Sequence, residues 1–209
     1  VNGQPFSEIK LEPMVKLIRL LRSMKDMVTG IEKTKFKELQ KKDESDPACR
    51  DPKSAECPSF AQVIGNRVDE VKQLLLPLGN TIATKFRRQK QLDASGVSFG
   101  AIRLPLMEAV EKPPMLMDQL LVIEALIHVY ESTKIESYLW AARETYAYLQ
   151  KYYNPKTNFF DMDSKISTVP IIVQMLRTFK LMSKHLESSE RIILTEKVKV
   201  WEFSLERVQ

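Results

Sequence analysis

Residues 115–130 read MLMDQLLVIEALIHVY, an apolar run with few polar interruptions. Its apolar side chains lie on nearly every side of a helix with 3.6 residues per turn, so we predict a buried helix here. The run also carries Asp118 and Glu124, and it is therefore no uncharged window of the ~20 residues that a membrane helix needs. The segment predicts a helix at the centre of a protein core.

Apolar residues three or four positions apart continue on both sides of this run, and they predict helices over 11–42, 60–86, 115–132, 135–153, 168–185 and 188–208. The first helix has a stripe that should face another helix of this chain or of a partner, formed by Met14, Ile18, Leu21, Met24, Val28, Ile31 and Leu39. Gly30 is expected to weaken or break this helix, and Pro77 to kink or break the next. We predict an all-α fold of antiparallel helical hairpins, packed as a bundle or a partial α/α array.

The predicted helices divide the chain into three parts. Residues 1–92 form a long helical pair, 93–114 an irregular connector, and 115–209 two helical hairpins, although all three can belong to one domain. The opening at Val1 indicates a processed chain or a piece of a longer one.

Two cysteines, Cys49 and Cys57, bracket a polar, turn-rich loop. We predict a disulfide between them, which would stabilise the fold by roughly 2–3 kcal/mol and places the protein in the periplasm or outside the cell. The alternative is two free thiols in a cytosolic protein. No structural zinc is expected, because no further cysteine pair or nearby histidine supplies the other ligands.

The last hundred residues contain a weak repeat, in which Ala125-Leu126 aligns with Met175-Leu176. A more specific pattern covers residues 116–161: Asp118-Gln119 before an apolar helix, Tyr130-Glu131-Ser132-Thr133, Tyr138-Leu139, then residues 154–161, NPKTNFFD. This pattern resembles one hairpin of the α/α-toroid (six-hairpin) proteins, many of which process glycans. Asn154 replaces an aspartate of that family, and Asn158 stands in place of two glycines. The predicted helices are too few for a closed ring, so the resemblance implies a piece of a toroid or an open array.

Candidate chemistry concentrates at this hairpin. A toroid glycosidase would need paired carboxylates, for which Asp118, Asp161 and Asp163 are the candidates. Dense aromatic residues offer a surface for a sugar or peptide, although rings at helical spacing most often form core. The residues selected for ligand binding are Asp118, Tyr152, Tyr153, Phe159, Phe160 and Asp161. Helix packing is the simpler interpretation of His128 and His185, and no cofactor or metal motif occurs.

Charge and composition limit the partners. The net charge of +5 comes from 32 basic and 27 acidic residues that are mixed along the chain, so nucleic acid is not an expected partner. We predict a non-catalytic binding or scaffold domain of an extracytoplasmic protein, with a protein or glycan partner. The alternative is a fragment of an α/α-toroid carbohydrate-active enzyme, in which carboxylates and exposed aromatic rings would surround one concave pocket.

Overall fold

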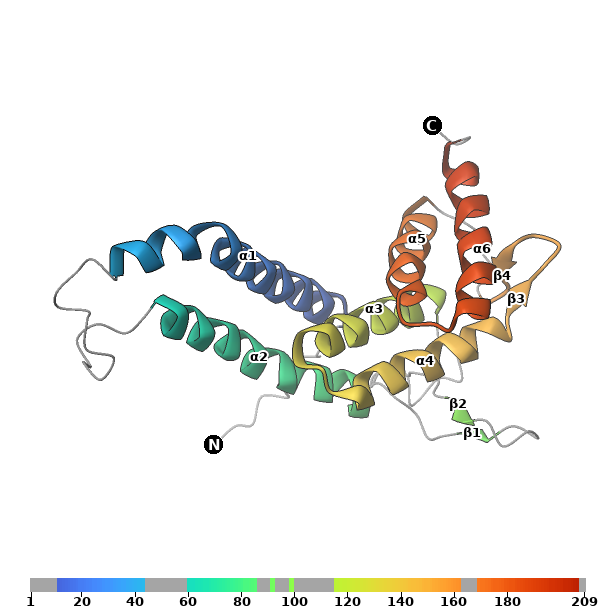
Figure 1. The fold of residues 1–209 in the computed structure, drawn as a ribbon. Helices are drawn as coiled ribbons and strands as arrows, with labels where there is room; N and C mark the ends of the chain where they lie inside the picture. Colours follow the sequence, from blue (N-terminus) through green and yellow to red (C-terminus); the bar gives the residue numbers. More distant parts are fainter. Residues whose placement is uncertain are drawn as a thin grey trace, which may run out of the picture.

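The computed structural model describes residues 11–43, 60–85, 91–92, 98–99, 115–162 and 169–206. Within them the chain forms α1 (Leu11–Asp43), α2 (Phe60–Lys85), α3 (Leu116–Thr133), α4 (Glu136–Gln150), α5 (Val169–Ser183) and α6 (Ser188–Glu206). Two short antiparallel ladders join β1 (Gln91–Leu92) to β2 (Ser98–Phe99) and β3 (Tyr153–Asn154) to β4 (Phe159–Phe160) (Figure 1). The predicted all-α fold is confirmed.

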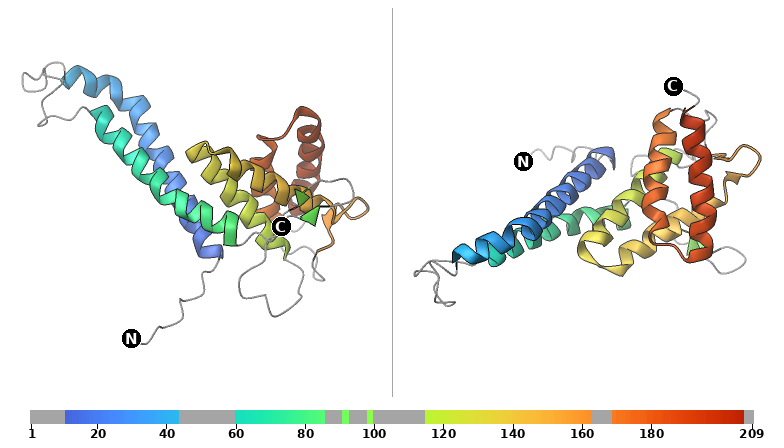
Figure 2. Two further views of the ribbon diagram at one scale, coloured as in Figure 1. Left: turned by 90° about the horizontal axis from the view of Figure 1, so that it is seen from below. Right: turned by 45° about the horizontal axis from the view of Figure 1, so that its top comes forward.

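Helices α1 and α2 form a long antiparallel hairpin that projects from the remaining helices (Figures 1 and 2). Their interface buries Ile18 and Leu21 of α1 and Leu75 and Ile82 of α2. The predicted break at Gly30 is wrong, because α1 continues to Asp43. A break at Pro77 is also wrong: α2 passes through this residue, which lies on the exposed side of the helix.

Helix α3 is the centre of the fold and packs against α1, α2, α4 and α5. Most of its side chains are buried, as the apolar run predicts. Lys134 ends α3 with a left-handed backbone (φ 61°), and its N–H donates to the Tyr130 carbonyl at 2.7 Å. This tight turn sends α4 back along α3, so the end of α4 lies near the start of α3 (Figure 1).

A close contact fixes α2 against the α3–α4 pair. A Cβ atom at Gly79 would lie 2.8 Å from Val129 Cγ1 and 3.0 Å from Tyr138 Cε1. The next residue, Asn80, accepts a hydrogen bond of 2.7 Å from the Tyr138 hydroxyl. Glycine therefore lets these helices approach to a distance that any larger residue would prevent.

Helices α5 and α6 form the last hairpin, and α5 packs across α3 (Figure 2). Pro170 lies in the first turn of α5, where a missing N–H costs nothing. The core is continuous from α1 to α6, with Phe179 and Trp201 fully buried at its far end. Cys49, Cys57 and Asp163 lie outside the described residues, as does most of the 93–114 connector.

Candidate functional site

The β3–β4 hairpin brings five of the six predicted ligand-binding residues together. Tyr153 pairs with Phe160 in the ladder, and the Tyr153 hydroxyl donates to Asn158 Oδ1 at 2.9 Å. Asn158 has a left-handed backbone (φ 58°), a conformation that asparagine tolerates better than most residues. Its carbonyl accepts a hydrogen bond of 2.6 Å from the Trp201 indole. The hairpin is thus attached to α6, in a stretch for which apolar spacing predicts no helix beyond residue 153.

The aromatic rings of this hairpin pack mainly against one another. Phe160 is buried and stacks on Phe179, with centroids 5.6 Å apart. Phe159 and Tyr153 are half-buried against the core, and the Lys197 ammonium covers the Tyr153 ring at 3.5 Å from its centroid. These rings therefore belong to the hydrophobic core or its edge, and little of their surface is open to a ligand.

The remaining predicted residues also have structural partners. The hydroxyls of Tyr152 and Tyr148 lie 3.1 Å apart, and their rings meet edge to face. Asp161 is exposed and accepts a hydrogen bond of 2.8 Å from the Asn154 amide. Asp118 lies on a different element, in the first turn of α3, where a negative charge is favoured by the helix dipole.

A buried carboxylate in the middle of α3 is the most strongly bound charge among the described residues. Glu124 is 1% exposed. Arg19 of α1 donates a hydrogen bond to each of its oxygens, from Nε to Oε1 at 2.7 Å and from Nη2 to Oε2 at 2.6 Å. The Gln174 amide of α5 donates to the same carboxylate, and His128 Nε2 lies 3.5 Å from it. One side chain of α3 therefore joins three helices.

These contacts decide the protonation of Glu124. Burial alone raises the pKa of this carboxyl group, because a low dielectric disfavours its charged form. Hydrogen bonds from His128, Arg19 and Gln174, together with the charge of Arg19, outweigh burial and lower the pKa to about 2. A carboxylate so firmly ionised is a poor general acid, and it is well suited to hold helices together.

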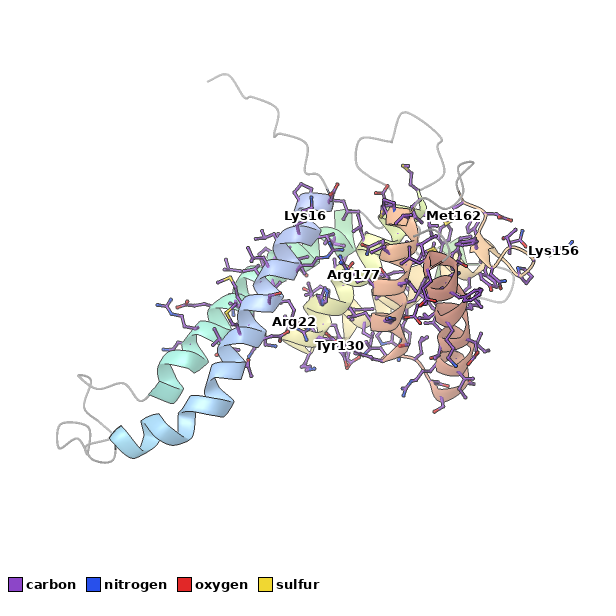
Figure 3. The ribbon with its side chains drawn as sticks, turned by 90° about the horizontal axis from the view of Figure 1, so that it is seen from above. Lys16, Arg22, Tyr130, Lys156, Met162 and Arg177 are labelled. Carbon is purple, nitrogen blue, oxygen red and sulfur yellow. The ribbon has the colours of Figure 1, made fainter. Side chains whose placement is uncertain are left out.

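The same arrangement recurs two helical turns further along α3. Glu131 accepts a hydrogen bond of 2.5 Å from Arg22 Nη1, and its other oxygen lies 3.0 Å from His185 Nε2. Burial raises the pKa of Glu131. The hydrogen bond with His185 and the charge of Arg22 outweigh burial, so the pKa lies below its ordinary value. Figure 3 shows Arg22 beside the end of α3 that carries Tyr130. We call these two sets, with Gln174, the Arg–Glu–His network.

A different feature lies on the opposite side of α1. Leu17, Leu20, Met24 and Met27 follow one another at intervals of three, four and three residues and are 43%, 58%, 45% and 64% exposed. This is the a/d spacing of a coiled-coil seam over two heptads. Met24 belongs to this exposed row, whereas Met14, Ile18 and Leu21 are buried, so the predicted stripe divides between two apolar faces of α1.

Helix α2 adds Leu74, 56% exposed, to the same side of the hairpin. Each residue turns a helix by about 100°, so Leu20 points about 160° away from Arg22, which faces α3. Leu74 points about 140° away from Gly79, which meets α3 and α4. Both therefore lie on the face of the α1–α2 hairpin that is turned away from α3. We define the outer seam as Leu17, Leu20, Met24, Met27 and Leu74.

Helix α6 also exposes apolar side chains, but Glu196 interrupts their row; they are Ile192, Ile193, Val200 and Phe203, at 66%, 59%, 41% and 55%. A shallow open depression on α2 is lined by Asn66, Asp69, Glu70, Gln73 and Leu74, and its two acids already pair with Lys72 and Arg67. No helix in the part of the chain that the structure describes has the length and apolar character to cross a membrane. Over the same residues, no three histidine, cysteine or acidic side chains gather as metal ligands.

Comparison with known proteins gives no relative for this chain: no protein family, curated protein or solved structure matches it. The resemblance of residues 116–161 to an α/α-toroid hairpin therefore stays a prediction. Arg19, Arg22 and the outer seam are the features that sequence reasoning missed. The heptad spacing at 17, 20, 24 and 27 was the available signal for the seam, whereas nothing in the sequence paired Arg19 with Glu124.

Proposed function

We propose that this chain is a non-catalytic binding or scaffold module that associates with a protein partner through the outer seam. The observation that carries the proposal is the coexistence of a fully packed internal stripe and a second, exposed heptad row on one helix. Contiguous apolar patches of several hundred Å² are uncommon on monomers and mark interaction sites. Four neighbouring apolar side chains of α1 are each roughly half exposed and lie in one row, as expected of such a site.

The acids and rings also favour a non-catalytic role. An inverting or retaining glycosidase needs two carboxyl groups facing one substrate, one of them able to give up a proton near neutral pH. Glu124 and Glu131 are held ionised by arginines, and Asp161 lies exposed on a hairpin whose rings are packed. The carboxylates described here are thus engaged in holding elements together. The extracytoplasmic location rests on Cys49 and Cys57 and stays a prediction of the sequence.

A site-specific photo-crosslinker tests the proposal. A benzoylphenylalanine at Leu20 should give a discrete covalent adduct with a protein in an extract of the source cells, whereas the same group at Ile192 should not. Ile192 is a matched control, because it is also an exposed aliphatic residue (66%) but lies on α6, in the last hairpin of the fold and not on α1 or α2. Equal labelling from both positions, or none from either, would contradict the proposal.

A parallel assay addresses the carbohydrate alternative. The intact chain is incubated with a panel of polysaccharides and oligosaccharides, and released reducing ends are measured. We expect no release. Hydrolysis that is abolished by Asp118→Asn or Asp161→Asn, but not by Glu124→Gln, would instead support a carbohydrate-active enzyme.

A further inference from the structure

We infer that the partner on the outer seam is a second copy of this chain, packed antiparallel so that two α1–α2 hairpins form a four-helix bundle. The inference rests on the proposed function and specifies its partner. Two helices that pack face to face through one apolar stripe each are half of such a bundle, and a twofold axis supplies the other half. A second copy fits the seam in its pattern, its charges and its size.

The pattern of the seam is self-complementary. In an antiparallel pair centred near Arg22, Leu17 lies opposite Met27 of the second copy, and Leu20 lies opposite Met24 of the second copy. Antiparallel coiled coils pair a positions with d positions, which is the arrangement that these spacings produce. Each of the four layers then contains one leucine and one methionine, so all layers have the same volume. The flexible methionine side chain fits readily against a branched one.

The charges around the seam favour a copy over a charged partner. Coiled coils usually select a different partner through charges at the flanking e and g positions. Here one flank is α2, and the other carries Lys16, Ser23 and Gly30. Lys16 is neutralised by Glu12 at 2.8 Å, and an antiparallel copy would place it beside Gly30. No like charges therefore meet at these flanking positions of α1, and the small residues let a second helix approach closely.

The size of the seam determines the expected strength. It spans about two heptads of α1 plus Leu74, so the buried area would lie at the lower end of the range for specific complexes. We expect a dimer with a dissociation constant on the order of micromolar.

Sedimentation velocity of the intact chain over a range of micromolar concentrations tests the dimer. The wild type should shift from monomer to dimer, and Leu20→Glu should raise the dissociation constant at least about 100-fold, because each dimer would bury two unpaired carboxylates. Ile192→Glu is the matched control and should leave the constant unchanged. Circular dichroism checks that both variants remain helical. A wild type that is monomeric at every concentration, or a dimer that Leu20→Glu leaves intact, would overturn the inference.

Engineered cysteines test the direction of packing. Mixing Leu17→Cys and Met27→Cys chains under mild oxidation should give the mixed 17–27 disulfide, identified by mass spectrometry of its linked peptides. The 17–17 disulfide should not form, because ten residues of helix separate these positions by about 15 Å in the antiparallel register. A dominant 17–17 product would show a parallel pair and contradict this arrangement. An adduct of Leu20 with an unrelated protein, in a chain that stays monomeric, would overturn the self-association and leave the proposed function standing.

Discussion

Replacing Arg19 with methionine is expected to lower the free energy of unfolding by about 3 kcal/mol at neutral pH. The change removes the cation that grips Glu124 and leaves a buried carboxylate without its charge partner. The magnitude is that of breaking a buried ion pair, about 3–5 kcal/mol, taken at its lower end because Gln174 and His128 still contact Glu124. Methionine keeps the length of the arginine stem, so the variant reports mainly the lost charge.

The pH dependence of stability provides a second signature. The folded-state pKa of Glu124 lies below its unfolded value, so the ionised group stabilises the native state above about pH 4.5. This contribution is lost as the pH falls from 4.5 towards 2. In Arg19→Met the pKa is depressed less, and the stability should change less across this window. Glu131 keeps its own partners in both proteins, and the difference between their profiles therefore isolates Glu124.

Urea unfolding followed by far-UV circular dichroism measures both effects. Lys16→Met is the control. Like Arg19, Lys16 lies on α1 and pairs with a glutamate, but Lys16 and its partner Glu12 are largely exposed, at 66% and 64%. We expect no measurable change in the control, since exposed pairs contribute little. A loss of less than about 1 kcal/mol in Arg19→Met, with an unchanged pH profile, would refute the argument that this pair holds α1 to α3.

Three further predictions concern packing. Gly79→Ala should lower the thermal midpoint measured by circular dichroism, because the new Cβ would press on Val129. The expected loss in the free energy of unfolding is about 1–3 kcal/mol. A midpoint that stays or rises would show that α2 can shift freely. Asn158→Gly should be tolerated better than Asn158→Ala in urea unfolding, because only glycine adopts the left-handed backbone without strain; equal losses would assign the effect to the lost Tyr153 hydrogen bond. In an ultraviolet titration one tyrosine should ionise near pH 12, since burial raises the pKa of Tyr146 to about 12, and Tyr146→Phe should remove that step; its survival in the variant would contradict the assignment.

Helix positions could be predicted from the sequence because apolar spacing is a local property. The ends of α3, α5 and α6 fall within two residues of the predicted ends. Helix α4 ends at Gln150 rather than Tyr153, since the chain turns into the β3–β4 hairpin there. Pro77 was predicted to disturb α2, but the carbonyl that loses its donor belongs to the exposed Gln73, where water can replace the missing bond.

Contacts between distant residues were beyond the reach of the sequence. Glu124 interrupts an apolar run and was visible as an anomaly, yet its partner Arg19 is 105 positions away and appears in the sequence as one basic residue among 32. The apolar residues of α1 also cover more than half of its circumference. Spacing alone therefore could not show which row would face α2 and which would remain on the surface. Only the packing of α3 against α1 decides this.

The most direct test of the outer seam is the rate of methionine oxidation by peroxide at increasing protein concentration. Met24, Met27 and Met115 are similarly exposed in the single chain, at 45%, 64% and 49%, and so provide two reporters and an internal control. Self-association through the seam predicts that oxidation of Met24 and Met27 slows as the protein concentration rises, while Met115 reacts at a constant rate. A constant rate at all three residues would contradict self-association through the seam.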